Sequence, residues 1–304
     1  FPVWDYVILT ASNEDQAEGY RMQIEKRKDY LPTATHFAVI PDEGGVRVGS
    51  GGATLSVIRY IYEQEKIKCG HGHFDNLRIL VIHSGGDSKR VPTYSALGKL
   101  FSPVPHKLPD GRSSTLFDEF LIVMSSVPAR IREGMLLLSG DVLLLFNPLQ
   151  IDFSGRGAAA ISFKENVETG KNHGVFLNGE NNTVRKFLHK QTVETLTQAG
   201  AVNENQCVDI DTGAVIFSVE MLDALYSLIK TDKLYKKYVN DTVRLSLYGD
   251  FLYPLAEDST LEDYYKEKPE GSFGPELYDA RSVVWETLRP FRLKLLRLAP
   301  AKFI

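Results

Sequence analysis

The chain has 304 residues, of which 43% are hydrophobic and 24% are charged, and its formal net charge at pH 7 is −4. This composition is typical of a globular protein, and the lack of a basic excess excludes a protein that wraps a nucleic-acid polymer. With two cysteines, no apolar run near the roughly 20 residues of a membrane span and no signal-peptide pattern at its start, the sequence predicts a cytoplasmic protein that contacts no membrane.

In the first half of the chain, patterns typical of strands and helices alternate. Strands are expected at residues 5–12, 36–40, 77–82 and 135–141, and helices at 14–29 (capped by Asn13), 49–66 and 113–126. This alternation predicts an α/β fold with a mostly parallel sheet that is covered by helices. Ligands of such sheets bind beyond the carboxyl ends of the strands, where three polar clusters of this chain fall.

The second half is less regular. Short strands at 157–163, 173–178 and 183–190, separated by Asn/Gly-rich turns, predict a small antiparallel insertion over the sheet. We then expect an apolar strand at 207–218, a helix at 220–230, a helix or strand-to-helix junction at 241–256 and a charged loop at 257–272. The last 14 residues read as a strand without a closing turn, which suggests a piece of a longer protein.

The segment HSGGDSKRVPTYSALGK, residues 83–99, follows a predicted buried strand. Its glycines and serine offer backbone N–H groups to phosphate oxygens, the arginine can bind two such oxygens, and the lysine supplies a point charge. It is not a Walker A loop, because Leu100 follows Gly98 and Lys99 where that motif needs Ser or Thr. The alternative is a surface loop with two unrelated cations. The candidate phosphate contacts are Gly85, Gly86, Ser88, Arg90 and Lys99.

A second glycine-rich segment, GSGGAT, falls at what we expect to be an adjacent strand end. Glycines also serve tight turns and helix caps, so this segment alone is weak evidence for a phosphate site. Its candidate nucleotide contacts are Gly49, Ser50, Gly51, Gly52 and Thr54.

Acidic residues supply candidate ligands for a metal ion. Asp141 follows the predicted strand at 135–141 and is placed to hold Mg²⁺, which favours one or two carboxylates together with phosphate and water oxygens. Asp250, in YGDF, is a possible second ligand; a turn or helix cap is the alternative for both. Asp209 and Asp211 alternate on a strand, so both are expected on one face, as in the metal-binding Asp-x-Asp of many glycosyltransferases.

The sequence CGHGH, residues 69–73, holds three potential zinc ligands, but zinc sites normally draw on spaced pairs and no complementary pair lies nearby. We therefore expect a loop here. Nucleophilic catalysis has no evident carrier, because no Gly-x-Ser-x-Gly elbow is present and Cys207 falls in a predicted strand.

Taken together and in order, HSGGDSKRVP, SALGK, GSGGAT, LSGDV, HGVF, FLHK and YGDF resemble the fucose-1-phosphate guanylyltransferase (GDP-fucose pyrophosphorylase) family, including the pyrophosphorylase part of bifunctional fucokinase/GDP-fucose pyrophosphorylases. The resemblance runs from about Asp5 to the C-terminus. It implies a Rossmann-like, sugar-nucleotidylyltransferase-like fold with helices on both faces of the sheet. The implied reaction joins GTP and L-fucose 1-phosphate into GDP-L-fucose and pyrophosphate, with Mg²⁺, in fucose salvage.

The resemblance also implies roles for individual residues. It assigns the triphosphate to the glycines, serine and arginine of residues 85–90, with Lys99 acting on the α-phosphate and the departing pyrophosphate. Lys190 would face the sugar phosphate, and Asp141 and Asp250 would hold Mg²⁺. The implied sugar contacts are His173, Gly174 and Asp211.

At the level of domains, the resemblance implies that residues 1–304 form a nucleotidylyltransferase domain. Its nucleotide-binding half would be 1–150 and its sugar-binding half 151–304. The domain would be followed in the parent chain by a β-helix and possibly a sugar kinase domain. One departure is Gly98 before Lys99, where the wider superfamily has proline. Two alternatives stay open: a glycosyltransferase with Asp209 and Asp211 as its metal pair, and a nucleotide-sugar-binding module without turnover.

Overall fold

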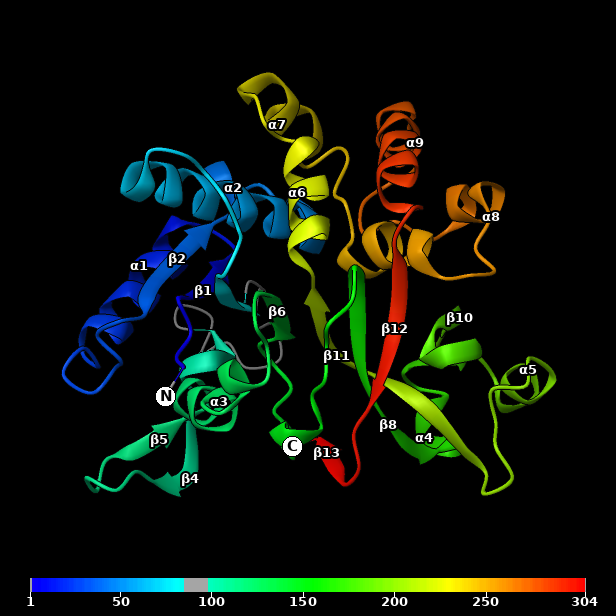
Figure 1. Ribbon diagram of the computed structural model, residues 1–304, viewed down its shortest axis with the longest axis horizontal. Helices are drawn as coiled ribbons and strands as arrows, with labels where there is room; N and C mark the ends of the chain where they lie inside the picture. The colour runs from blue at the N-terminus through cyan, green and yellow to red at the C-terminus, as the bar shows by residue number, and fades with distance from the viewer. Residues whose placement is uncertain (1, 85–97, 304) are drawn as a thin grey trace.

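We analysed a computed structural model of the chain, which describes residues 2–84 and 98–303 (Figure 1). The strands are β1 Tyr6–Ala11, β2 His36–Pro41, β3 Arg78–His83, β4 Pro103–Lys107, β5 Ser113–Thr115, β6 Gly134–Ser139, β7 Leu144–Phe146, β8 Gly157–Asn166, β9 Gly174–Asn178, β10 Val184–His189, β11 Cys207–Phe217, β12 Arg292–Arg297 and β13 Ala301–Phe303. The α-helices are α1 Glu14–Glu25, α2 Gly49–Cys69, α3 Leu116–Met124, α4 Val167–Gly170, α5 Val193–Gln198, α6 Val219–Ser227, α7 Asp232–Tyr238, α8 Leu261–Lys266 and α9 Pro275–Leu288. Shorter turns of helix that matter below are η3 Lys99–Phe101, the π-helical η7 Leu247–Leu252 and η8 Tyr253–Leu255.

A mixed sheet of nine strands crosses the described part of the chain in the order β10-β9-β11-β6-β3-β1-β2, with β8 added to β11 and β12 added to β8. Its first-half strands β2, β1, β3 and β6 are all parallel, which confirms the sequence prediction. In the second half, β11 pairs antiparallel with β6, β8 and β9, so these strands continue the same sheet. The antiparallel strands predicted for the second half are therefore present, but they extend the sheet edge to edge instead of lying over it.

Apolar side chains alternate between the two faces of this sheet, and helices bury both faces. On one face, α2, α6 and α9 pack against residues such as Ile8, Val81 and Leu137. On the other, α1 and α3 pack against residues such as Leu9 and Leu138. Figure 1 shows α2, α6 and α9 gathered along the upper side of the sheet. Successive residues of a strand, such as Ile8 and Leu9, belong to two different cores, each covered by helices. The expected helices on both faces are therefore confirmed.

Three local expectations need correction. β2 was expected to be buried, but only Val39 in it is, because β2 is the edge strand of the sheet. The charged segment 257–272 contains a helix, α8, whose Tyr264 is fully buried and whose N-terminus is capped by Thr260. The strands that precede the two glycine-rich segments, β2 and β3, are not neighbours as expected, because β1 lies between them.

One further expectation holds at the start of the chain. Asn13 caps α1 as predicted, with its side-chain oxygen accepting a hydrogen bond from the N–H of Gln16 at 2.9 Å.

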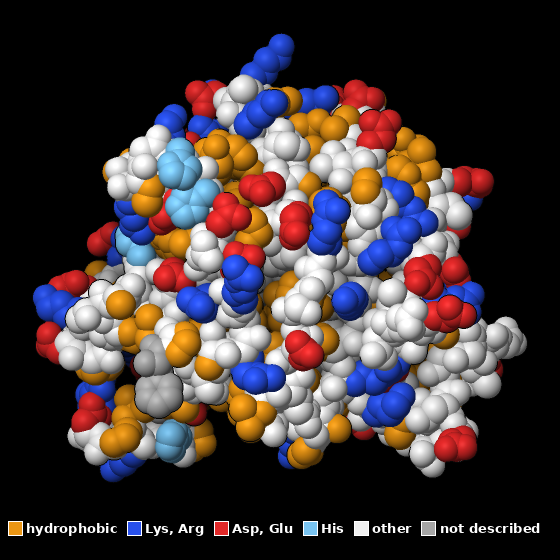
Figure 2. All heavy atoms as spheres, viewed as in Figure 1, with side chains coloured by type: hydrophobic (Ala, Val, Ile, Leu, Met, Phe, Trp, Pro, Cys, Tyr) orange, Lys and Arg blue, Asp and Glu red, His pale blue; other side chains and the backbone are white. Residues whose placement is uncertain are grey.

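Among the described residues, no helix combines the length and the apolar character that crossing a membrane requires. On the face shown in Figure 2, acidic and basic side chains are interspersed. Several acidic and basic residues form ion pairs, such as Arg59 with Glu63 and Arg185 with Asp258.

Candidate active site

The carboxyl end of β6 brings an acid and a base together. Ser139 ends the strand, and its hydroxyl donates to Oδ1 of Asp141 at 2.6 Å. Nζ of Lys99 lies 3.9 Å from Oδ2 of the same carboxylate, and both side chains are about half exposed to solvent. Gly140 is needed between them, because a Cβ there would lie 2.9 Å from the carbonyl oxygen of His83. The structure thus brings Lys99 and Asp141 together at this edge of the sheet, while their roles toward phosphate and Mg²⁺ stay predictions.

Lys99 is held in place by the residues that follow it. Leu100 and Phe101 are buried, and the ring of Phe101 packs between those of Tyr20 on α1 and Phe117 on α3. This apolar anchor fixes η3 while the ammonium group stays at the surface. A cation held this way is available to an anionic ligand at the end of β6.

A pocket of about 730 Å³ opens beside this pair. It is formed by the end of β6, the start of β9, the middle of β11, the turn around η7 and the segment 267–270. The lining residues are Ser139, Val142, His173, Gly174, Phe187, His189, Asp211, Thr212, Gly213, Ser246, Tyr248, Gly249, Tyr253, Glu267, Lys268, Pro269 and Glu270. The three residues predicted to border a sugar, His173, Gly174 and Asp211, are therefore brought into one pocket, while their role stays a prediction.

Asp211 reaches the pocket at an irregularity in β11. The pairing of β11 with β8 changes register between Asp211 and Val215, and Gly213 in this stretch has a φ of +75°. Burial raises the pKa of Asp211 to about 6, although the N–H of Gly213 donates to its carboxylate at 3.0 Å and lowers the pKa in part. At neutral pH this group is a carboxylate that lies in a poorly hydrated pocket and can accept hydrogen bonds from ligand hydroxyl groups.

Tyr248 lies close enough to Asp211 and Asp141 for both carboxylates to affect its pKa. Burial raises its pKa far above the ordinary value, and the negative charges of Asp211 and Asp141 raise it further. The phenol therefore stays protonated and can donate a hydrogen bond. Tyr248 was missed from the sequence, although it lies in the same YGDF motif from which Asp250 was chosen.

Basic groups gather around His189 at the end of β10. Burial lowers the pKa of His189, and the positive charges of Lys190 and Lys268 lower it further. Lys190 itself is exposed, has a φ of +48° and donates its N–H to the carbonyl oxygen of His173 at 3.0 Å. The pocket thus has Lys268 in its wall, Lys190 close enough to act on His189, and the carboxylate of Asp211 inside, which matches an anionic ligand that also carries hydroxyl groups.

The glycine-rich GSGGAT segment does not form a free phosphate cradle. It lies within the first turns of α2, where the N–H groups of Gly51 and Gly52 donate to the carbonyl oxygen of Leu245 at 2.7 and 3.3 Å. Ser50 donates through both its N–H and its hydroxyl to Glu270. The donors of Ser50, Gly51 and Gly52 are thus occupied by the chain itself, and Thr54 is fully buried and bonds Ser50 and His83. These contacts count against the nucleotide-binding prediction for Gly49, Ser50, Gly51, Gly52 and Thr54.

Asp250 is also corrected as a metal ligand. Its carboxylate is completely buried, with Oδ1 accepting from Nε of Arg281 at 2.8 Å and Oδ2 accepting from the N–H of Ser246 at 2.6 Å. Both oxygens are thus taken by the protein, and no path leads to solvent from a group with no exposed surface.

The Asp-x-Asp pair is divided as well. Asp209 is buried in ion pairs with Arg297 at 3.0 Å and Lys164 at 3.2 Å, whereas Asp211 lines the pocket. The two carboxylates therefore do not form an open metal pair. Gly85, Gly86, Ser88 and Arg90 lie outside the described residues, so their predicted contacts with a triphosphate stay predictions.

Asp141 fits the requirements of a magnesium ligand. Its carboxylate is accessible, has a hydroxyl neighbour in Ser139, and lies at the edge where phosphates are expected. Of the two predicted Mg²⁺ ligands, Asp141 is exposed to solvent whereas Asp250 is enclosed by the protein.

The sequence of the chain is similar to those of proteins from one enzyme family. Residues 72–304 match the family model described as the fucose pyrophosphorylase domain. The chain is similar to the fucose-1-phosphate guanylyltransferases of Mus musculus (27% identical) and Homo sapiens (28%), each match covering 99% of this chain and 54% and 53% of those proteins. It is also 28% identical to the bifunctional fucokinase/GDP-fucose pyrophosphorylase of Arabidopsis thaliana, over 89% of this chain and 28% of that protein. The chain thus spans about half the length, or less, of these curated relatives.

Proposed function

Because the chain belongs to the fucose pyrophosphorylase family, we propose that it transfers a guanylyl group from GTP to L-fucose 1-phosphate, forming GDP-L-fucose and pyrophosphate. A phosphate oxygen of the sugar phosphate forms a bond to the α-phosphorus of GTP, and the bond from that phosphorus to the bridging oxygen breaks. The electron pair of the broken bond leaves with pyrophosphate. Such transfers depend on positioning and charge neutralisation, so a protein nucleophile is not required.

The observation that carries this proposal is the Lys99–Asp141 pair, which adjoins the pocket of about 730 Å³ through Ser139, a lining residue that donates to Asp141. Lys99 supplies positive charge to the α-phosphate and the departing pyrophosphate. Lys190 and Lys268, which both act on His189, attract the phosphate of the sugar. Asp211 and the phenol of Tyr248 lie inside and offer an acceptor and a donor to the sugar hydroxyls.

Magnesium is part of the proposal. Asp141 would hold Mg²⁺, and the ion would supply charge neutralisation for the phosphate oxygens. We place the reaction in fucose salvage in the cytoplasm, where the two free cysteines, Cys69 and Cys207, stay reduced. A further β-helix and a sugar kinase domain in the parent chain remain proposals drawn from the family resemblance.

The test is pyrophosphate release by the purified chain with Mg²⁺, GTP and L-fucose 1-phosphate, repeated with the other nucleoside triphosphates. We expect release with GTP and a loss of about 10²- to 10³-fold in kcat/KM for Lys99→Ala, because a preorganised charge at the transferred phosphate is removed. Lys107→Ala, at an exposed lysine of β4, is the matched control and should keep wild-type activity.

The outcomes separate the alternatives. Tight GTP binding with no pyrophosphate release from any triphosphate would favour a binding module over the transferase. Full activity in Lys99→Ala would leave the reaction standing but would remove Lys99 from it. Metal-dependent glycosyl transfer that is lost in Asp209→Ala but kept in Lys99→Ala would replace the proposal by the glycosyltransferase alternative.

A further inference from the structure

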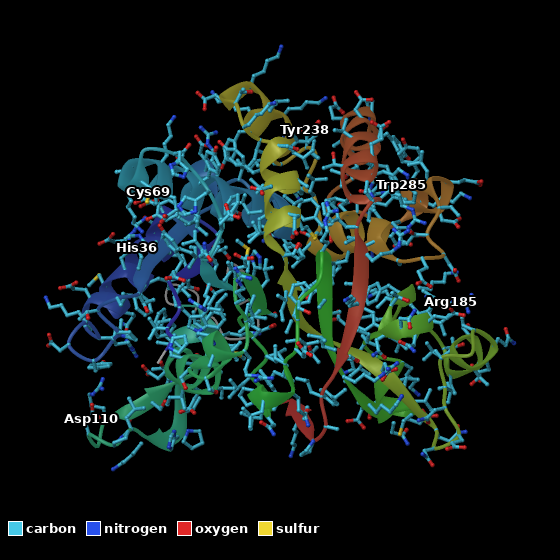
Figure 3. The ribbon with its side chains drawn as sticks, in the orientation of Figure 1. His36, Cys69, Asp110, Arg185, Tyr238 and Trp285 are labelled. Atoms are coloured by element: carbon cyan, nitrogen blue, oxygen red, sulfur yellow. The ribbon has the colours of Figure 1, made fainter. Side chains whose placement is uncertain are left out.

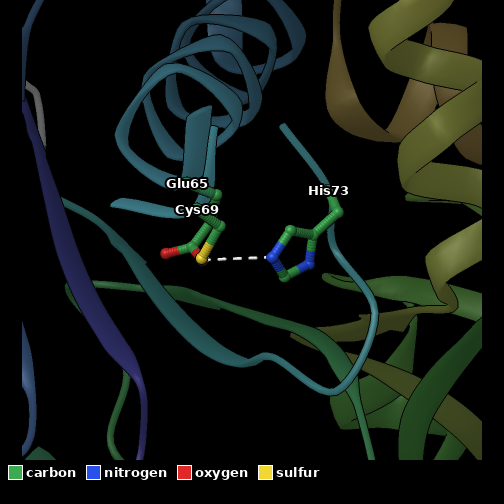
Figure 4. Close-up of side chains that lie close together, drawn as sticks. All are labelled: Glu65, Cys69 and His73. Carbon is green, nitrogen blue, oxygen red and sulfur yellow. Dashed lines mark hydrogen bonds and ion pairs between the residues drawn. The ribbon is translucent and has the colours of Figure 1, made fainter. Parts of the chain in front are cut away.

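A buried carboxylate, a thiol and an imidazole meet where α2 ends. Glu65 and Cys69 are four residues apart on the helix, so both lie on one side of its last turns. Gly70 ends the helix with a φ of +83°, and the chain turns so that His73 comes back to face the helix. Figure 4 shows the three side chains directed toward one another.

The distances within this cluster fit a small divalent cation. Nε2 of His73 lies 3.3 Å from Oε2 of Glu65, and Sγ of Cys69 lies 3.8 Å from the same oxygen. The three ligand atoms all lie within 4.8 Å of one another. Zinc bonds of about 2.0–2.3 Å in tetrahedral geometry place ligand atoms roughly 3.3–3.8 Å apart, so little movement is needed to surround an ion.

The second oxygen of Glu65 is fixed from the opposite side. Oε1 accepts hydrogen bonds from the hydroxyl of Tyr6 and, at 3.0 Å, from Nζ of Lys68. These two contacts orient the carboxylate and leave Oε2 to face Cys69 and His73, as outer contacts orient metal ligands elsewhere.

An ion can reach the cluster from solvent. Glu65 is buried, with 6% of its side chain exposed, but 23% of the His73 side chain is exposed and Cys69 is at the surface. Figure 3 labels Cys69 at the outer end of α2, and histidine side chains gather on the surface in the same region in Figure 2. The negative end of the α2 dipole adds a further preference for a cation.

We propose that Glu65, Cys69 and His73 bind Zn²⁺, with water in the fourth position. Carboxylate, thiolate and imidazole are all zinc ligands, and a thiolate disfavours Mg²⁺ and Ca²⁺. The site lies by Tyr6, at the amino end of β1, whereas Lys99 and Asp141 lie at the carboxyl end of β6. The two sites are therefore at opposite ends of the parallel strands. The zinc site does not rest on the proposed function, and its effect is on the stability of the α2 terminus.

The sequence prediction of a plain loop at CGHGH is revised by this site. The loop alone offers no spaced pair of ligands, but α2 supplies Glu65 four residues before Cys69. Within the cluster His73 is the imidazole ligand, while His71 lies beside it, with the two ring centroids 5.2 Å apart.

The test is titration of the metal-free purified chain with Co²⁺, whose spectrum reports its ligands. We expect one Co²⁺ per chain, a near-ultraviolet thiolate-to-cobalt band, visible bands of four-coordinate cobalt, and displacement of both by Zn²⁺. Cys69→Ser should abolish the near-ultraviolet band, and Cys207→Ser, at the other cysteine, should keep it. Binding should weaken at least ~100-fold in His73→Ala but stay at the wild-type level in His71→Ala.

Several results would overturn the site. These are absence of the near-ultraviolet band at a large excess of Co²⁺, its survival in Cys69→Ser, or its loss in Cys207→Ser or His71→Ala. Cys69 and His73 are partly or fully exposed, so their variants are expected to fold, and circular dichroism checks this. As a second readout, Zn²⁺ should raise the Tm of the wild type and of Cys207→Ser but not that of Cys69→Ser, because an ion that binds only the folded state stabilises it.

Discussion

Gly49 shows how a residue chosen for one role in the sequence serves another in the structure. It begins α2 with a φ of +82°, and a Cβ at this position would lie 2.4 Å from the carbonyl oxygen of Leu245. That oxygen accepts the N–H groups of Gly51 and Gly52. The glycine is thus required by the close approach of two backbones, and the same small residues that suggested a phosphate site are explained by packing.

We expect Gly49→Ala to lose more stability than Gly70→Ala at the other end of α2. Both positions have nearly the same positive φ, so both variants suffer backbone strain of about 1–2 kcal/mol. Around Gly70 a Cβ would meet nothing within 4 Å, whereas at Gly49 it collides with Leu245 and adds about 1–3 kcal/mol. Urea unfolding measures the difference; equal losses in the two variants would contradict the packing role.

Among elements, η7 is tied to α9 by an ion pair without exposed surface. Asp250 on η7 and Arg281 on α9 are both fully buried, and Nη1 of Arg281 also donates to the carbonyl oxygens of Tyr264 and Glu267 around α8. The ion pair and these bonds hold together three elements, of which η7 contributes Tyr248 and Gly249 to the pocket wall. Asp250 therefore acts on the position of Tyr248 through structure rather than through a metal.

Asp250→Asn should destabilise the protein by about 3–5 kcal/mol, because it leaves the Arg281 charge buried without its partner. The matched control is Asp258→Asn, which removes one acid of the surface pair Asp258–Arg185, labelled at Arg185 in Figure 3, and should cost less than about 1 kcal/mol. Unfolding midpoints give both values. Unchanged stability combined with a higher Mg²⁺ requirement in Asp250→Asn would restore the metal role that the structure removes.

Individual helices and strands show most clearly which features can be predicted from the sequence. The periodicity of α1, α2 and α3 and the apolar runs of β1, β3 and β6 predict these elements because local patterns set them. The Lys99–Asp141 pair follows from the rule that parallel strands bring their carboxyl ends to one edge. The burial of Asp250 could not be predicted, because its partner lies 31 residues further on and neither residue's neighbours indicate the pairing. Tyr248 was missed because a single tyrosine in an apolar segment reads as core.

At the scale of the whole molecule, titration of a few buried groups couples stability to pH. His83 at the end of β3 contacts Thr10 of β1 and Thr54 of α2, and burial lowers its pKa from 6.5 to about 4. The unfolded chain binds a proton near pH 6.5 while the folded protein does not, so the stability that neutral His83 contributes is lost as pH falls from about 6.5 to about 4. Burial raises the pKa values of Asp42 and Asp211 to about 6, and these groups act in the opposite direction.

His83→Gln should therefore flatten the acid side of the stability profile. Relative to the variant, the wild type is expected to lose up to about 3 kcal/mol of unfolding free energy between pH 7 and pH 4, from a pKa difference of about 2.5 at 1.36 kcal/mol each. Between pH 7.5 and 9 the difference between the two proteins should stay constant, which is the internal control. Urea unfolding at each pH measures it, and parallel profiles down to pH 4 would refute the assignment.

The pairing of β12 with β8 affects how the chain folds during its synthesis. Arg292 pairs with Gly157, so the neighbour of β8 is made 135 residues after it. At about 5–20 residues per second, a ribosome needs on the order of ten seconds to supply that partner. Throughout this interval the nascent chain carries β8 with an unpaired, alanine-rich edge, which is a surface that chaperones and other unfinished chains recognise. We therefore expect protection of that edge until synthesis reaches β12 to raise the yield of folded protein.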